Sequence, residues 1–533
     1  MTRGAPRTTS ASQPTGRTFV LIFVALLFAM LLTALNQTIL GTALPTIVGE
    51  LNGASHMLWV ITAFILASTI TMPIYGKLGD LVGRKYLLVT AISVFLVGSV
   101  IGALAPSMGW LIAARVVQGL GGGGLMILSQ SIIADIVPAR ERGKYMGWMG
   151  GVFAFASVVG PLIGGWLTEG PGWRWTFWFN LPVGALALVG ALMFLKAPTH
   201  RVRPRLDVWG MVFIALSTTG LVLVASWGGN QYAWTSPTIL ALSAGTVATG
   251  VVFVLIERRT AEPIIPMGLF RDRNFRLTTA AGLLTAVAMF GSIGYMPTYL
   301  QMATGASATE AGLLMIPMMG ALLAASVVSG QLVSRTGRYK WMPIAGSLIM
   351  VLALILMGLL TADSEVWHIC LNLGILGFGL GLNMQILVLI VQNSFPLSQV
   401  GTATAASTYF RQIGATLGSA VIGSLFASRL SGYLAERLPP QAAQATSGGN
   451  SLTPELVQQL PEDVRRVVVG AYSEALIPLF LYMAPMAAVA AVLCLFLTEN
   501  PLATTLDPTT SGPAAGVVTD PLQAPAASGR ASA

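Results

Sequence analysis

Long apolar runs recur along the whole chain and set the strongest limit on its fold. Examples are Thr18–Leu40, Leu87–Ala105 and Ala475–Leu497. Each reaches the roughly 20 residues that a helix needs to cross the hydrocarbon core of a bilayer. Because backbone polar groups find no water there, such segments must hydrogen-bond internally as helices. The sequence therefore predicts an all-α integral membrane protein.

Charged residues are too few to cover a water-facing surface. Asp, Glu, Lys and Arg make up 9% of the 533 residues, whereas an ordinary globular domain carries roughly a quarter charged residues. This balance excludes a soluble enzyme. The three histidines, His56, His200 and His368, lack the spacing of metal ligands, and the sequence contains no G-x-x-x-x-G-K-[ST] phosphate loop. We therefore expect no metal, no cofactor and no enzymatic activity.

Breaks at proline, glycine and charge divide the apolar sequence into fourteen predicted transmembrane helices. The approximate ranges are 18–40, 57–75, 86–105, 109–136, 145–168, 176–195, 208–228, 236–256, 276–300, 308–333, 341–361, 367–393, 403–428 and 475–497. The first run has no small-residue cleavage signal and is expected to remain as an anchor.

Basic residues indicate the orientation in the membrane. Most of the 29 Lys and Arg residues fall in the N-terminal tail or in alternate loops, and such loops are cytoplasmic. We expect a multi-pass protein of the plasma or inner membrane with both termini in the cytoplasm. The net charge of +9 is then a topology signal, and nucleic acid is excluded as a partner.

A glycine-rich loop is repeated at a fixed offset. Gly76–Lys85 reads GKLGDLVGRK, and Gly330–Arg338 reads GQLVSRTGR. The same offset relates Gly160 to Gly414, so the register holds over a long stretch. Two homologous halves explain this pattern, because internal repeats around a central site are typical of transporters.

The repeat predicts two pseudo-symmetric six-helix bundles with two helices inserted between them. The expected division is a cytoplasmic tail at 1–17, a first bundle at 18–195, the inserted pair with cytoplasmic linkers at 196–275, a second bundle at 276–497 with an extracytoplasmic loop at 429–474, and a disordered cytoplasmic tail at 498–533. Within the outer loop, Pro454–Tyr472 is expected to form a short helix on the membrane surface. We expect a monomer in the lipid bilayer.

Four motifs together resemble the major facilitator superfamily, in its fourteen-helix drug:proton antiporter branch. They are the loop Gly76–Lys85, the helix-four set Arg115, Gln118 and Gly119, the helix-five set Gly160, Pro161, Gly164 and Gly165, and the segment Trp173–Pro182. The resemblance covers nearly the whole chain. It implies a major facilitator fold and a secondary active transporter that exports amphipathic small molecules, such as drugs or antibiotics, by alternating access with proton coupling.

Three other functions stay open at this point. The same machinery would export one endogenous natural product or lipid, or act as a facilitator that is not coupled to protons. A receptor or scaffold without transport is the third. The intact loop, helix-four and helix-five motifs speak against it, because a scaffold does not need them.

The repeated loop has the residues of a conformational latch. Gly76 and Gly83 permit close packing and a tight turn, and Asp80 can pair with Arg84. The resemblance adds that Asp80 faces the N-terminus of helix thirteen, where the helix dipole favours a carboxylate. The equivalent residues of the second half are Gly330, Gly337 and Arg338. The alternative is that the basic residues only enforce topology, which does not need a carboxylate.

Helix five combines closely spaced glycines with a proline. Gly160, Gly164 and Gly165 offer a small-residue face for backbone contact, and Pro161 removes a helical hydrogen bond and favours a bend. Such a contact suits a helix that rocks against its neighbour. Simple helix packing is the alternative, because glycines of this kind are common in membrane helices.

Two arginines lie within predicted helices, where a charge is costly and points to function. Arg115 is at a depth similar to that of Asn36 in helix one. We expect Asn36 and Gln37 to bond Arg115 or a substrate, with Gln118 nearby and Arg411 in helix thirteen. Relatives usually carry an aspartate in place of Asn36, so the usual proton-coupling acid is missing. A cavity with arginines and no central carboxylate should prefer neutral or anionic amphiphiles over lipophilic cations.

The other carboxylates of the apolar segments lie near predicted helix ends. They are Asp135, Asp207, Glu257 and Glu310. Solvated structural roles are expected for them. None of them is expected to replace a mid-membrane acid.

Overall fold

The computed structural model describes residues 16–51, 53, 56–195, 206–229, 231–361, 364–437, 457 and 461–504. Within these residues the chain is built from helices, and no strand is assigned. Most of the two predicted tails, 1–17 and 498–533, lies outside the described residues, so the expected disorder of the C-terminal tail stays a prediction.

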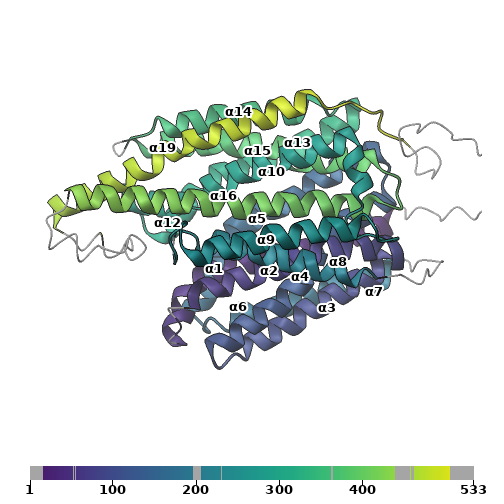
Figure 1. Cartoon of the computed structure of the whole chain (residues 1–533), viewed down its shortest axis with the longest axis horizontal. Coiled ribbons are helices and arrows are strands. Elements are labelled where there is room, and N and C mark those ends of the chain that lie inside the picture. Colours follow the sequence, from purple (N-terminus) through teal and green to yellow (C-terminus); the bar gives the residue numbers. More distant parts are fainter. Residues whose placement is uncertain are drawn as a thin grey trace, which may run out of the picture.

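The helices follow one another in the order shown in Figure 1. Their bounds are α1 Arg17–Glu50, α2 Met57–Val82, α3 Arg84–Ala103, α4 Met108–Ile136, α5 Ala139–Glu169, α6 Trp175–Trp178, α7 Asn180–Phe194, α8 Val208–Trp227, α9 Pro237–Glu257, η2 Met267–Arg271, α10 Arg273–Ile293, α11 Met296–Thr304, α12 Ala308–Leu314, α13 Ile316–Thr336, α14 Trp341–Gly358, α15 Val366–Ser394, α16 Val400–Arg437 and α19 Glu462–Leu495.

Within the described residues, 14 helical segments are long and apolar enough to cross a membrane. This result confirms the predicted all-α membrane fold with fourteen spans. Several helices exceed the predicted ranges, because apolar composition marks only the part within hydrocarbon while helical hydrogen bonding continues past it. For example, α1 continues to Glu50 and α5 begins at Ala139.

Two spans are broken by proline near the turn at 305–307. Pro297 lies in the first turn of α11 and Pro317 in the first turn of α13. Proline has no backbone N–H and clashes with the preceding turn, so a helix tends to restart at it. Each span therefore consists of a long helix and a short one, α10 with α11 and α12 with α13.

The loop predicted at 429–474 is shorter than expected. α16 continues to Arg437 and α19 begins at Glu462, so both ends of that range are helical. The surface helix expected at Pro454–Tyr472 is wrong in its described part, which is the continuous start of α19. Arg437 joins the two extensions by donating to Glu474 at 2.9 and 2.6 Å. This pairing supports helices that continue beyond the apolar runs.

Two groups of helices pack mainly within themselves, as Figure 1 shows. In the first group, α1 to α7, helices α2 and α3 pack on α4, and α1 packs on α5 and α7. In the second group, α10 to α19, helices α16 and α19 pack on α10, and α13 and α14 pack on α15. Helices α8 and α9 pair with each other, and α8 docks on α2 and α16.

The two groups meet mainly along two seams, α2 with α16 and α5 with α13. The sequence offset that relates Gly76 to Gly330 and Gly160 to Gly414 maps α2 onto α13 and α5 onto α16. The two seams are therefore equivalent by the repeat. They bring the repeated loops of both halves to the contact between the groups.

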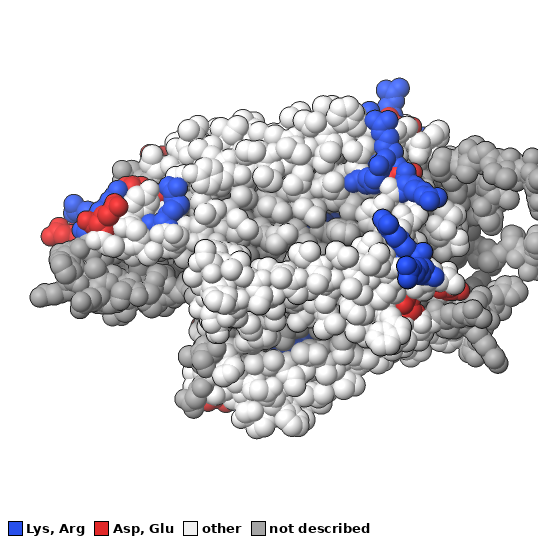
Figure 2. All heavy atoms as spheres, viewed as in Figure 1, with Lys and Arg blue, Asp and Glu red and all other residues white. Residues whose placement is uncertain are grey.

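Charge is concentrated at the ends of the molecule. In Figure 2 Lys and Arg gather at one end, charged residues of both signs lie at the other, and the surface between them is uncharged. Large apolar side chains such as Leu186, Val247 and Leu352 are at least half exposed. A broad apolar surface between polar ends suits contact with lipid. We call the end with Lys and Arg the basic end.

Candidate functional site

The carboxylate of Asp80 joins the two groups of helices. It lies in the last turn of α2 and accepts hydrogen bonds from the backbone N–H of Gly401 at 3.1 Å and of Thr402 at 2.7 Å. The Thr402 hydroxyl donates to it at 2.7 Å. These donors belong to the first turn of α16, whose free N–H groups and dipole attract an anion. The side chain of Asp80 is 4% exposed, so protein donors and not water hold the carboxylate.

Arg84 holds Asp80 from the other side. Its Nη2 donates to Asp80 Oδ1 at 2.7 Å and to the carbonyl of Leu397 at 3.1 Å. Its Nη1 pairs with the carboxylate of Asp135 at the end of α4. The side chain of Asp135 is 43% exposed and ion-paired at a helix end, so the expected solvated structural role holds for it. Arg84 ties the ends of α2, α3 and α4 to the segment before α16.

Glycines permit this close approach of α2 and α16. A β-carbon on Gly76 would lie 2.8 Å from the carbonyl oxygen of Gly401 and would overlap the side chain of Ala405. A β-carbon on Gly401 would overlap the carboxylate of Asp80. Gly83, between α2 and α3, has a φ of 104°, a conformation that other residues rarely adopt. Both the seam and the turn therefore require glycine.

The equivalent seam between α5 and α13 has a different polar contact. A β-carbon on Gly143 would lie 3.0 Å from the carbonyl oxygen of Gly330. Arg140 donates to the carbonyls of Ser334 at 3.2 Å and Arg335 at 3.0 Å. Ser334 stands at the repeat position of Asp80, so the second seam has no carboxylate there. A guanidinium bound to main-chain oxygens takes its place.

Gly337 and Arg338 lie at the end of α13 and are not brought near Asp80. Gly337 has a φ of 73° and ends the helix. The backbone N–H of Arg338 donates to the Thr336 hydroxyl at 3.2 Å. Gly337 and Arg338 therefore form a helix end, and the described residues there show no second copy of the Asp80 site.

Gly160 and Gly164 of the helix-five motif face α1 of the same group. A β-carbon on Gly164 would lie 2.7 Å from the carbonyl oxygen of Ile39, and one on Gly160 would overlap the Thr38 hydroxyl. That hydroxyl donates to the carbonyl of Ala156 on α5 at 3.0 Å. The glycines therefore permit backbone contact between α1 and α5, not contact across the seam.

Gly165 and Pro161 have different surroundings. A β-carbon on Gly165 would meet nothing within 4 Å, so the helix-five motif contains one glycine that packing does not need. Pro161 lies inside α5, which is assigned as one helix from Ala139 to Glu169. The proline is therefore accommodated without an interruption of the helix.

Asn36, Arg115 and Gln118 belong to one buried polar network inside the first group. Asn36 Oδ1 accepts hydrogen bonds from Gln118 Nε2 at 3.4 Å and from Asn180 Nδ2 at 3.3 Å. Gln118 also donates to Ser99 Oγ at 2.8 Å and accepts from Arg115 Nη1 at 2.8 Å. Each of these side chains is buried. Asn36 thus reaches Arg115 only through Gln118.

Arg115 is buried among protein groups, whereas Gln37 is exposed. Arg115 Nε donates to the carbonyl of Val60 at 3.0 Å, and the guanidinium lies 4.3 Å from the centre of the Phe64 ring. Arg115 is 1% exposed, so it faces neighbouring helices and no open space. Gln37 follows Asn36 and points about 100° around α1, where it is accessible.

Arg411 lies on α16 beside the face that contacts α10. Gly401 and Ala405 face Gly76 on α2, whereas Gly414 and Gly418 face the backbone of α10. Helical geometry places Arg411 about 20° around the helix from Gly418, at the edge of the face that contacts α10. Arg411 is half-buried, and the described residues offer it no hydrogen bond or ion pair.

The sequence analysis missed several residues of these sites. Thr402 and Leu397 complete the contact of Asp80 and Arg84, and Asn180 and Ser99 complete the Asn36 network. Asn180 gave a signal, because it is an amide inside the apolar segment Trp173–Pro182. Among the described residues, no three His, Cys, Asp or Glu side chains are grouped so that they could hold a metal ion.

Comparison with known proteins assigns the family. Residues 26–419 match the Major Facilitator Superfamily. An uncharacterized MFS-type transporter of Mycobacterium tuberculosis is 40% identical over 482 residues, which cover 90% of this chain and 70% of that protein. The multidrug transporter protein MdtP of Bacillus subtilis is 36% identical over 472 residues, which cover 86% of this chain and 87% of that protein.

A solved structure shares the fold. The crystal structure of the human organic anion transporter MFSD10 matches with a TM-score of 0.62 at 15% identity, covering 90% of this chain and 100% of that chain. The family resemblance drawn from the four motifs is thereby confirmed. On the extent of these matches, the chain belongs to the Major Facilitator Superfamily.

Proposed function

We propose that this chain is a secondary active transporter that exports amphipathic small molecules by alternating access. The contact of Asp80 with the first turn of α16 carries this proposal. It joins two helices of different groups through hydrogen bonds to a charged group, which contribute about 1.5–3 kcal/mol each. Contacts of this size favour one conformation and are still reversible by a ligand of matching differential affinity.

The basic end is proposed to be cytoplasmic, with both termini on that side of the plasma or inner membrane. Lys and Arg concentrate on the cytoplasmic side of membrane proteins. The start of α1 lies beside the start of α5, where Phe19 and Tyr145 have ring centroids 4.9 Å apart. The N–H of Arg140 donates to the carbonyl of Ala503 at 3.1 Å. The described ends of the chain therefore lie at the same end as Asp80, and this conformation is closed toward the cytoplasm.

The substrates are proposed to be neutral or anionic amphiphiles. Arg411 supports this choice, because its half-buried charge lacks a partner and an uncompensated cation attracts an anion. Arg115 does not support this choice, since it is 1% exposed and faces neighbouring helices. The name of the Bacillus subtilis relative, a multidrug transporter, supports a range of drugs over one endogenous product.

Proton coupling is part of the proposal, although Asn36 cannot carry the proton. The test is transport by the purified protein in liposomes, with a pH gradient as the only driving force. We expect accumulation of an anionic or neutral amphiphile, and loss of accumulation when the gradient is collapsed. Transport that ignores the gradient would show a facilitator without proton coupling.

Substrate charge is tested with the variant Arg411→Gln. We expect it to lose transport of an anionic amphiphile and to keep transport of a neutral one of equal size. Arg338→Gln is the matched control, because it removes an exposed cation at the end of α13. Wild-type preference for a monovalent lipophilic cation would contradict the proposed substrate class.

A further inference from the structure

The carboxylates of Asp207 and Glu257 lie together at the basic end of the inserted helix pair. Asp207 caps α8, where its Oδ1 accepts the N–H of Gly210 at 2.8 Å, and Glu257 is the last residue of α9. A β-carbon on Gly210 would overlap the Asp207 carboxylate and lie 3.0 Å from Glu257 Oε1. The two acids therefore flank one glycine, and they are 9% and 2% exposed. The expectation of solvated roles is wrong for both.

Among the described residues, no Lys or Arg side chain forms an ion pair with these two acids. Glu257 accepts only the backbone N–H groups of Ile264 at 3.2 Å and Ile265 at 3.3 Å. Asp207 Oδ2, the oxygen that the β-carbon of Gly210 would meet, has no hydrogen-bond partner. Two ionised carboxylates at such close quarters repel each other, and burial adds to the cost.

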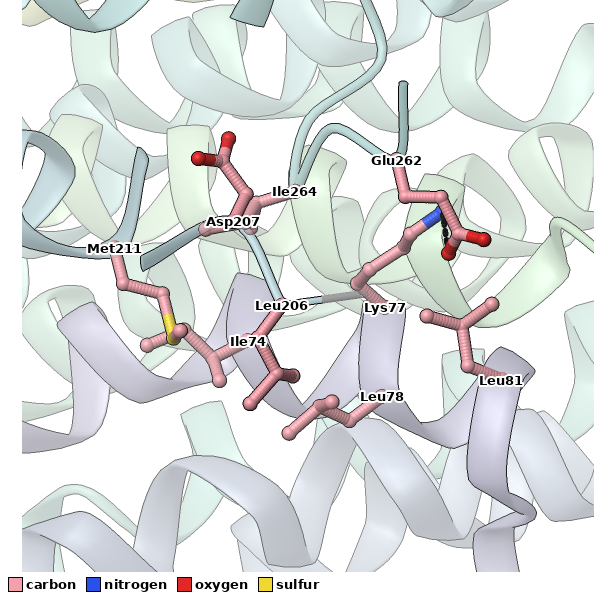
Figure 3. Close-up of a pocket in the computed structure, with 9 residues that line it drawn as sticks. All are labelled: Ile74, Lys77, Leu78, Leu81, Leu206, Asp207, Met211, Glu262 and Ile264. Atoms are coloured by element: carbon pink, nitrogen blue, oxygen red, sulfur yellow. Dashed lines mark ion pairs between the residues drawn. The ribbon is translucent and has the colours of Figure 1, made fainter. Parts of the chain in front are cut away.

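The nearest charges outside the pair belong to Lys77 and Glu262. In Figure 3 Lys77 on α2 reaches toward Glu262, and the Asp207 carboxylate is turned away from both, although all three line one pocket. Lys77 Nζ lies 3.7 Å from Glu262 Oε2. Arg258 is next to Glu257 in the chain but is exposed. Lys77 is therefore paired with Glu262 and, among the described residues, forms no ion pair with either buried acid.

We propose that Asp207 and Glu257 share one proton in this conformation and form the proton-binding site of the transporter. A shared proton removes one of the two charges and supplies the donor that Asp207 Oδ2 lacks. This inference rests on the proposed proton coupling and names the acid for it. It fills the place left by Asn36, which cannot take up a proton.

The position of the two acids near α2 links proton binding to alternating access. Lys77 lies about one turn before Asp80 on α2, so a movement of α2 that separates Asp80 from Thr402 also displaces the Lys77 ammonium. A change in the distance between this ammonium and the buried acids changes their affinity for the proton. Different proton affinities in two conformations are what coupling requires.

The test uses the full chain in liposomes with the variants Glu257→Gln and Glu141→Gln. Glutamine at 257 imitates the protonated acid, so we expect Glu257→Gln to fold, to bind substrate and to exchange substrate for substrate across the membrane. It should lose accumulation driven by the pH gradient and substrate-induced proton release. Glu141→Gln removes an exposed charge from the same end of the molecule, outside the pair, and should keep both.

Infrared difference spectroscopy adds a readout that does not depend on transport. We expect a protonated-carboxyl band in the substrate-induced spectrum of wild type and its loss in Glu257→Gln. If wild type moves no protons with substrate, the proposed coupling fails. If wild type does and Glu257→Gln keeps pH-driven accumulation and the band, the coupling stands and the assignment to this pair is overturned.

Discussion

Asn36 is held to Asn180 through its carbonyl oxygen alone. Its Oδ1 accepts from Asn180 Nδ2 at 3.3 Å, and its own Nδ2 has no hydrogen-bond partner. Gln118 donates to the same oxygen at 3.4 Å. The network therefore uses Asn36 only as an acceptor, which a carboxylate could also be.

This geometry predicts that Asn36→Asp is tolerated better than Asn36→Leu. Aspartate keeps the acceptor for both amides and gains attraction to the nearby guanidinium of Arg115. Leucine removes the acceptor and leaves the buried amide N–H groups of Gln118 and Asn180 without it. The free energy of unfolding should fall by about 1–3 kcal/mol. Thermal unfolding in detergent should rank wild type and Asn36→Asp above Asn36→Leu. Gln37→Leu, on the exposed side of α1, is the control; equal melting of Asn36→Asp and Asn36→Leu would contradict the role of the acceptor.

Replacement of Asp80 by asparagine should favour separation of α2 from α16. The amide keeps one acceptor oxygen but loses the charge that attracts Arg84 and the N-terminus of α16. A loss of about 1.5–3 kcal/mol shifts the conformational equilibrium by roughly tenfold or more. Labels on the ends of α2 and α16 at the basic end should report a longer mean distance by electron spin resonance.

Glu141→Gln is the matched control for Asp80→Asn. Glu141 is an exposed acid in the first turn of α5, at the same end of the molecule. It should leave the distance between the labels unchanged. An unchanged distance in Asp80→Asn as well would show that the glycine contacts alone hold the seam.

The two adjacent glycines of helix five should differ sharply in their tolerance of alanine. Gly164→Ala places a methyl group against the backbone of Ile39 and the Thr42 hydroxyl, and overpacking of this kind costs about 1–3 kcal/mol. Gly165→Ala enters open space and should be neutral or slightly stabilising, since alanine is the better helix former. Melting temperature and transport of both variants check this, and equal effects would mean that the α1–α5 contact tolerates separation.

The sequence predicted the loop of Asp80 well but not its partners. The glycines, Asp80 and Arg84 lie within ten positions of one another, so their spacing is readable along the chain. Thr402 and Leu397 are more than three hundred positions away from Asp80 and Arg84. Only the family resemblance pointed to the thirteenth predicted span, 403–428, which lies in α16. Contacts between distant segments depend on packing that a single sequence does not display.

The inserted pair, α8 and α9, shows why the prediction of solvated roles for Asp207 and Glu257 failed. Asp207 and Glu257 stand where apolar runs end, which predicts solvent. The chain after α9 turns back, and Ile264 and Ile265, which are 4% and 1% exposed, donate their N–H groups to Glu257 and cover it. Hydropathy locates the end of a span but cannot show that a following segment folds over it.

Tyr409 is expected to fasten the inserted pair to the second group. Its hydroxyl lies 2.8 Å from that of Thr218 on α8, and both side chains are buried. A buried hydrogen bond of this kind contributes about 0.5–1.5 kcal/mol, so Tyr409→Phe and Thr218→Val should each lower the melting temperature. Because both act on one bond, the double variant should lose no more than the worse single variant. Tyr232→Phe, at an exposed tyrosine, should have no effect, whereas additive losses in the double variant would show that the two hydroxyls act independently and that apolar packing alone holds α8 on α16.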